Sequence, residues 1–86
     1  MYTVLIEKHV FKDLDSFPSE DVARIQEAIM SLQDDPRLPG TQKLRGYPAR
    51  YRLRQGRYRI IYEIDEKDKI VRIMLAGHRK DVYRGM

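Results

Sequence analysis

The middle of the chain carries arginines at spacings suited to holding phosphate. Residues 51–64 read YRLRQGRYRIIYEI, two alternating runs around Gln55-Gly56. This pattern predicts a β-hairpin with a two-residue loop, in which Gly56 supplies the positive φ of a tight turn. Arg54 would then lie opposite Arg57, and Arg52 opposite Arg59. Because side chains alternate along a strand, these four guanidinium groups would share one face.

Four like charges on one face favour an anionic partner. Like charges placed directly across a ladder destabilise it, so a ligand that neutralises them is expected there. Guanidinium groups suit phosphate, because their planar forks bond two oxygens at once. The opposite face of the hairpin is apolar and is predicted to be core: Tyr51, Leu53, Tyr58, Ile60 and Tyr62.

The positive charge is concentrated around this hairpin. The net charge is +4, and no acidic residue occurs between Lys43 and Arg59. Lys43 and Arg45 extend the basic patch before the hairpin begins. A localised basic patch indicates a nucleic acid or an acidic protein as partner. A merely solvated basic surface is the alternative.

Composition and spacing exclude several classes of chemistry. The 86 residues include no cysteine, so a disulfide, a cysteine-ligated zinc and a thiol nucleophile are all excluded. No acidic cluster has metal-ligand spacing, and we expect neither a metal nor a small-molecule cofactor. The chain shows no signal peptide and no apolar run of membrane-spanning length, which predicts a cytoplasmic protein without a membrane partner.

The flanking segments predict the elements that position the hairpin. Residues 1–8 alternate like a strand, and residues 9–17 have helical spacing that ends before Pro18. Ser19 is the expected N-cap of a second helix, which Asp35-Pro36 closes. Its apolar stripe is Val22, Ile25, Ile29 and Leu32. Residues 37–48 are expected to be irregular, and residues 69–76 form a further strand.

Together these elements predict one α+β domain over residues 1–86. An N-terminal strand and two helices precede a three-stranded antiparallel meander, and both helices pack on the tyrosine-rich face. In the expected register Val71, Ile73 and Leu75 join that core face, while Arg72 and Met74 lie on the arginine face. The arginine face would remain uncovered.

Two segments resemble a known family. KLRGYPARYRLRQGRYRIIYEI followed by VRIMLAGHRKDVYR is similar to the RelE group of the RelE/ParE toxin superfamily, the toxins of prokaryotic toxin–antitoxin modules. The resemblance covers nearly the whole chain. It implies a microbial ribonuclease-like RelE fold and an endoribonuclease that cleaves messenger RNA in the ribosomal A site, where 16S ribosomal RNA is also a partner. It further implies neutralisation by a cognate RelB-like antitoxin.

The resemblance also implies site residues. The family's basic pair on the first hairpin strand falls on Arg52 and Arg54, and its next arginine on Arg59. Its C-terminal arginine and tyrosine fall on Arg79 and Tyr83. Arginine is effectively never deprotonated, so Arg52 and Arg54 are expected to stabilise charge rather than to act as bases. His78, beside Arg79, replaces another basic residue and could titrate near neutrality.

The expected chemistry is attack of the 2′-hydroxyl of RNA on the adjacent phosphorus. It needs a base, cations around the pentacovalent phosphate and a proton donor for the leaving 5′-oxygen. Arg59, Arg79, Tyr83 and His78 are the candidate catalytic residues. Arg52, Arg54, Lys43, Arg45 and Arg57 are the candidate phosphate-binding residues, although Arg57 borders the turn.

Other interpretations remain open. Tyr83 could instead anchor the tail to the sheet, and His78 could be a surface residue. The protein could poison DNA gyrase as ParE does, or bind acidic partners without catalysis. The uncovered face also bears Ile61, Ile70 and Met74 beside the arginines, and we expect an acidic antitoxin segment to dock there.

Overall fold

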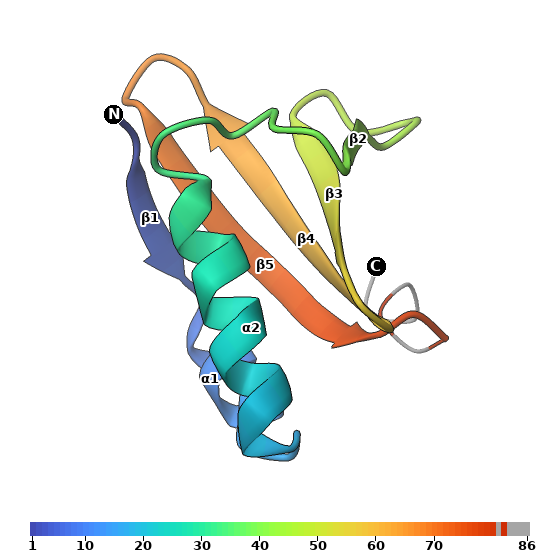
Figure 1. The fold of residues 1–86 in the computed structure, drawn as a ribbon. Coiled ribbons are helices and arrows are strands. Elements are labelled where there is room, and N and C mark those ends of the chain that lie inside the picture. Colours follow the sequence, from blue (N-terminus) through green and yellow to red (C-terminus); the bar gives the residue numbers. More distant parts are fainter. Residues whose placement is uncertain (81, 83–86) are drawn as a thin grey trace.

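The fold is a five-stranded mixed sheet with two helices against one face (Figure 1). The computed structural model describes residues 1–80 and Val82. The spatial strand order is β1-β5-β4-β3-β2. The elements are β1 (Thr3–Ile6), α1 (Lys8–Leu14), α2 (Ser19–Ser31), β2 (Thr41–Lys43), β3 (Arg50–Gln55), β4 (Tyr58–Asp65) and β5 (Ile70–His78). Neither helix has the length and apolar character needed to cross a membrane. The predicted α+β class is confirmed.

The core lies between α2 and the tyrosine-rich face of the sheet. Ile25, Ile29 and Leu32 recur every three or four residues, so they share one side of the helical segment and are buried. They belong to the same apolar cluster as Ile60 and Tyr62 of β4. The predicted packing of the helices on this face is therefore confirmed.

The boundaries of α2 differ from the prediction. Pro18 is the N-cap and Ser19 is the first helical residue, without a side-chain capping bond. Glu20 and Asp21 lie in the first turn, where the helix dipole favours acidic side chains. The helix ends at Ser31 rather than at Asp35-Pro36.

Two strand pairings were not predicted. β1 pairs in parallel with β5, so that Thr3 lies beside Ile70, and this makes the sheet mixed rather than antiparallel throughout. β2 forms inside the segment that was expected to be irregular, and it pairs antiparallel with β3, with Gln42 opposite Arg52. Three residues are too few for an alternating pattern to be visible in the sequence.

The central hairpin exists, but its loop differs from the prediction. Gln55 pairs with Tyr58, so the loop consists of Gly56 and Arg57 instead of Gln55 and Gly56. Gly56 has φ +59° and is followed by a residue of negative φ, the pattern of a type II′ turn. The predicted Arg54–Arg57 and Arg52–Arg59 pairs are therefore wrong.

A bulge in β5 moves Leu75 away from the predicted core face. Ile61 pairs with Leu75 and Tyr62 with Ile73, so Met74 is an extra residue in β5. An extra residue reverses the alternation beyond it. Val71 and Ile73 join the core as expected, whereas Leu75 lies with Ile61 on the arginine face.

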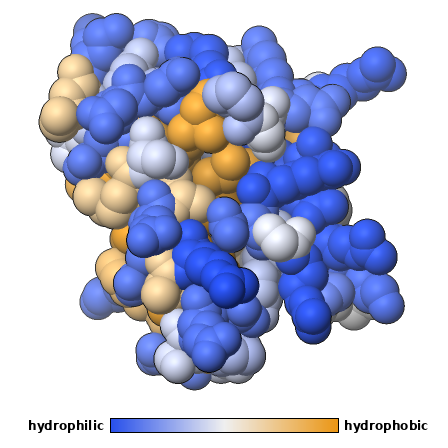
Figure 2. Space-filling model, viewed as in Figure 1, coloured by the Kyte–Doolittle hydropathy of each residue, from blue (hydrophilic) through white to orange (hydrophobic). Residues whose placement is uncertain are grey.

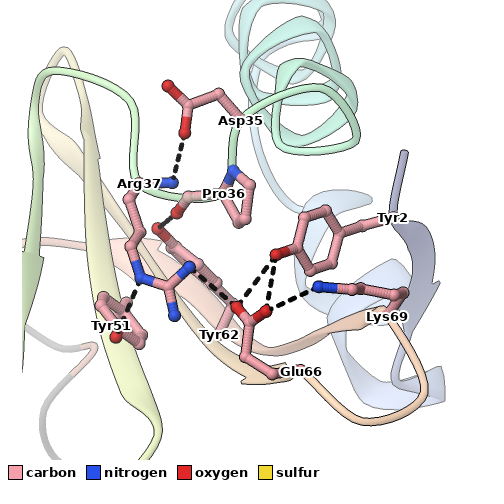
Figure 3. Close-up of polar contacts among 8 residues, drawn as sticks. All are labelled: Tyr2, Asp35, Pro36, Arg37, Tyr51, Tyr62, Glu66 and Lys69. Atoms are coloured by element: carbon pink, nitrogen blue, oxygen red, sulfur yellow. Dashed lines mark hydrogen bonds and ion pairs between the residues drawn. The ribbon is translucent and has the colours of Figure 1, made fainter.

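A polar cluster ties the start of the chain to the β4–β5 turn (Figure 3). The Glu66 carboxylate accepts hydrogen bonds from the Tyr2 hydroxyl at 2.9 Å and from Lys69 Nζ at 3.0 Å. Arg37 Nη1 pairs with it at 2.8 Å. Lys69, Arg37 and Tyr2 together lower the pKa of Glu66 from 4.5 to about 2. The cluster lies at the opposite end of β4 from the Gly56-Arg57 turn.

Candidate nucleic-acid interface

Three arginines of the hairpin share the sheet face that the helices leave uncovered. Arg54 lies directly opposite Arg59, and Arg52 lies opposite Ile61. The side chains of β3 and β4 remain on their predicted faces despite the change of register, because a shift of two residues keeps each side chain on the same side of the sheet. The prediction that Arg52, Arg54 and Arg59 share a face is confirmed. Arg57 instead lies in the turn and is exposed.

The cations of the turn and of the end of β5 meet around one hollow. The backbone N–H of Arg79 donates to the carbonyl of Arg57 at 3.0 Å, which fixes the end of β5 beside the turn. The hollow has a volume of about 460 Å³. We call it the hairpin hollow; its walls are Gly56, Arg57, Arg59, His78, Arg79 and Lys80. Lys80 was not singled out from the sequence, although it directly follows Arg79.

Carboxylates neutralise arginines farther along the sheet from the turn. Arg50 pairs with Glu63 at 3.0 Å, and Arg72 with Glu7 at 3.7 Å. Within residues 1–80 and Val82, Arg54, Arg57, Arg79 and Lys80 have no ion pair with a carboxylate. Arg59 Nη1 donates to the carbonyl of Tyr58 at 3.2 Å. Positive charge is therefore concentrated at the hairpin end of this face.

Arg52 is held toward β2. Its Nη2 donates to Gln42 Oε1 at 2.7 Å, across the β2–β3 pair. Its Nε is buried and has no hydrogen-bond partner among the described residues. Arg52 also lines a second concavity together with Lys43 and Arg45, between β2 and the loop that follows it. The predicted phosphate-binding residues therefore divide between two hollows on either side of Arg54.

His78 stands at the boundary between the two sheet faces. It pairs with Tyr58, and its ring meets the Tyr58 ring edge-on with centroids 6.3 Å apart. Its Nδ1 accepts a 3.4 Å hydrogen bond from the Lys80 backbone N–H. Since Tyr58 belongs to the core face, the pairing directs His78 away from Arg59, yet His78 still contributes to the wall of the hairpin hollow.

Tyr58 connects the turn to α2 behind this site. Its hydroxyl donates to Asp21 Oδ2 at 2.6 Å, and this bond raises the pKa of Tyr58. The Phe17 ring packs on Tyr58 with centroids 4.8 Å apart. These contacts fix the residue between Arg57 and Arg59 and so restrain the backbone that carries both arginines.

Polar and apolar surfaces separate on the molecule. Figure 2 shows hydrophilic residues gathered over the side that carries β3 and the hairpin turn, and hydrophobic patches nearer the helices. Ile61, one of three residues expected to form an apolar docking surface, is fully buried and so cannot contribute to one. Ile70 and Met74 are half-buried.

Tyr83 lies outside the described residues. Among the residues that the structure describes, no three histidine, aspartate or glutamate side chains are grouped as ligands of a metal ion would be.

Known proteins are similar to nearly the whole chain. Residues 4–83 match the family described as the ParE toxin of type II toxin-antitoxin system, parDE. Toxin RelG of Mycobacterium tuberculosis is 32% identical over 84 residues, which cover 96% of this chain and 97% of that protein. The archaeal RelE-RelB complex from Pyrococcus horikoshii OT3 contains a chain that is 36% identical, with a TM-score of 0.80 and coverage of 91% and 94%. The RelB-RelE antitoxin-toxin complex from Methanococcus jannaschii matches at 32% identity and a TM-score of 0.71, with coverage of 93% and 95%.

Proposed function

This chain belongs to the ParE toxin family within the RelE/ParE superfamily, and it is a RelE-like toxin of a type II toxin–antitoxin system; on this premise we propose that it is a cytoplasmic endoribonuclease that cleaves messenger RNA in the ribosomal A site. The observation that carries the proposal is the hairpin hollow. It gathers Arg57, Arg59, Arg79 and Lys80 beside Arg54, whose side chain lies on the sheet face opposite the core.

The proposed reaction is a phosphoryl transfer within the RNA, from the 5′-oxygen of one nucleotide to the 2′-oxygen of the nucleotide before it. The 2′-oxygen forms a bond to the adjacent phosphorus, and the bond to the 5′-oxygen breaks, leaving a 2′,3′-cyclic phosphate and a 5′-hydroxyl end. One proton leaves the 2′-hydroxyl and one is delivered to the 5′-oxygen. Arg54, Arg59 and Arg79 hold the phosphate and stabilise the charge that develops on its oxygens.

Proton transfer falls to the groups that can change protonation. Arginine is unsuited, because it stays protonated throughout the physiological range. His78 is the imidazole in the wall of the hairpin hollow, and Tyr83 is the phenol that the family resemblance assigns to the site. Both are proposed to assist proton transfer, with Tyr83 also able to stack on a base. No step uses a metal ion.

The ribosome is part of the proposed site. The hairpin hollow offers strong positive charge but few groups able to act as a base, so correct positioning of the 2′-hydroxyl must supply much of the rate. The A site holds the message in place, and 16S ribosomal RNA offers phosphates to the remaining cations, among them Lys43, Arg45 and Arg52.

The proposed regulator is a RelB-like antitoxin. The similar archaeal toxins from Pyrococcus horikoshii OT3 and Methanococcus jannaschii are seen in complexes with RelB. A cationic face is complementary to an acidic segment, and such a segment would compete with RNA for the same arginines. If the purified protein does not bind the product of an adjacent small gene, this proposal is wrong.

Mapping message ends on ribosomes tests the activity. Purified protein is added to translating ribosomes, and new 5′ ends are located by primer extension. We expect cuts within the A-site codon that disappear with Arg59→Ala. Lys67→Ala, at an exposed position in the β4–β5 turn, should cut normally.

A ParE-like action on DNA gyrase is the second candidate. The match to the ParE toxin family favours it, because that family is named for the toxin of the parDE module. Intact message together with DNA breaks in the presence of gyrase would support this candidate and reject ribonuclease activity. If both the message and the DNA remain intact, the remaining interpretation is a basic module that binds acidic partners without catalysis.

A further inference from the structure

A second hollow lies between β2 and the loop that joins it to β3. Its volume is about 630 Å³, within the range of sites that bind small ligands. We call it the loop hollow; its walls are Gln42, Lys43, Leu44, Arg45, Gly46, Tyr47, Pro48 and Arg52. The walls combine three cations and one aromatic ring, without a carboxylate.

The aromatic ring is held in place by an internal ion pair. The Arg50 guanidinium lies over the Tyr47 ring, 4.6 Å from its centroid. Glu63 neutralises Arg50, with its Oε2 3.1 Å from Nε and 3.0 Å from Nη2. Arg50 therefore serves to position Tyr47, while Lys43 and Arg45 form no ion pair among the described residues and keep their charge for a ligand.

The backbone around Tyr47 is preformed. The Leu44 N–H donates to the carbonyl of Arg50 at 2.8 Å, which closes the loop at its base. The Ile64 N–H donates to the carbonyl of Ala49 at 3.0 Å and ties the loop to β4. A ligand entering this hollow would thus meet a loop that is already ordered, which lowers the entropy lost on binding.

Arg52 links the two hollows. It lies two residues before Arg54 on the same strand and face, about 7 Å away along β3. Its buried Nε has no acceptor among the described residues. Because Arg52 lines the loop hollow and the same strand leads to Arg54, Arg52 marks a path for a phosphate backbone from the hairpin hollow to the loop hollow.

We propose that the loop hollow is a subsite for one nucleotide of single-stranded RNA. Its base stacks against Tyr47, and its phosphate is bound by Lys43, Arg45 and Arg52. An acidic peptide would use the cations alone, whereas a nucleotide uses both the cations and the ring. This inference rests on the proposed function, because the nucleotide is one that flanks the site of cleavage.

Binding of an uncleavable RNA to the full chain tests the subsite. The probe is a fluorescein-labelled hexanucleotide with 2′-O-methyl groups, which lack the attacking hydroxyl, and the readout is fluorescence anisotropy. Tyr47→Ala should weaken binding about five- to hundredfold, because stacking on an aromatic ring is lost. Tyr47→Phe should bind normally, since it keeps the ring. Phe11→Ala removes an exposed ring on α1 and should have no effect.

Further variants separate the subsite from the proposed function. Arg54→Ala should also weaken binding. If Tyr47→Ala and Tyr47→Leu bind normally while Arg54→Ala does not, the subsite is wrong and the proposed function stands. If all three bind normally, both are wrong. If hexaglutamate displaces the labelled RNA as well as unlabelled RNA does, and Tyr47→Ala does not change RNA binding, the loop hollow is a protein-docking surface. That result would overturn the nucleotide subsite. Thermal unfolding establishes that each variant is folded.

Discussion

Arg54 and Arg59 lie directly opposite each other across the β3–β4 pair, on the sheet face that the helices leave uncovered. Arg54 is exposed and Arg59 is half-buried. Two guanidinium groups in register repel each other, so this arrangement opposes folding. A phosphate bound between the two guanidinium groups, as proposed above, would offset this repulsion.

Replacing Arg54 should separate stability from activity. Arg54→Gln relieves the repulsion, and the free energy of unfolding should rise by about 0.2–1 kcal/mol. Cleavage of message on ribosomes should fall about tenfold or more, because a charge-assisted bond to phosphate is lost. Urea unfolding and primer extension measure the two effects. Lys67→Gln removes an exposed cation in the turn between β4 and β5, at the other end of β4, and as the control should change neither.

The salt dependence of RNA binding should report the hairpin hollow. For single strands, each phosphate contact adds about −0.7 to the slope of log affinity against log salt concentration. The double variant Arg57→Gln, Lys80→Gln should therefore reduce the slope by about 1.4. Anisotropy titrations with an uncleavable RNA at several KCl concentrations give the slope. An unchanged slope would show that these cations do not contact the RNA.

Acid should weaken the cluster around Glu66. Lys69, Arg37 and Tyr2 lower the pKa of Glu66 from 4.5 to about 2, so the folded state favours the carboxylate. Its contribution to stability is complete above pH 4.5 and is lost as the pH falls toward 2. The urea midpoint of the wild-type protein should decline over this interval, and Glu66→Gln should flatten that decline. Glu27→Gln, at an exposed position on α2, should leave it as it is.

The turn residue Gly56 should be sensitive to any side chain. Its φ of +59° lies in the left-handed region, although no atom within 4 Å would obstruct an added Cβ. Gly56→Ala should therefore lower the free energy of unfolding by about 1–2 kcal/mol through backbone strain alone. It should also weaken RNA binding, because the turn carries Arg57 and leads into Arg59. Unchanged RNA binding by Gly56→Ala would contradict this role of the turn.

The arginine face could be predicted from the sequence because alternation is robust. The true register differs from the expected one by two residues on β4, and a shift of two returns every strand residue to the same side of the sheet. Arg52, Arg54 and Arg59 therefore kept their predicted face. Arg57 did not, because a turn residue belongs to neither face.

Other features could not be predicted from alternation in the sequence. The bulge at Met74 is a matter of pairing between β4 and β5, so alternation alone placed Leu75 on the wrong side. The loop hollow depends on β2, which is only three residues long. The sequence analysis therefore did not predict Tyr47 as a site residue. The available signal was its position close after the cations Lys43 and Arg45.

The parallel pairing of β1 with β5 also bears on how the protein is made. Thr3 gains its strand neighbour only when Ile70 has been synthesised, and the hairpin hollow needs Arg79 and Lys80, which follow β5. Contacts between such distant segments form late. A chain that is still being translated therefore lacks the complete sheet. We expect the folded toxin to form only after β5 and the residues that follow it have been synthesised.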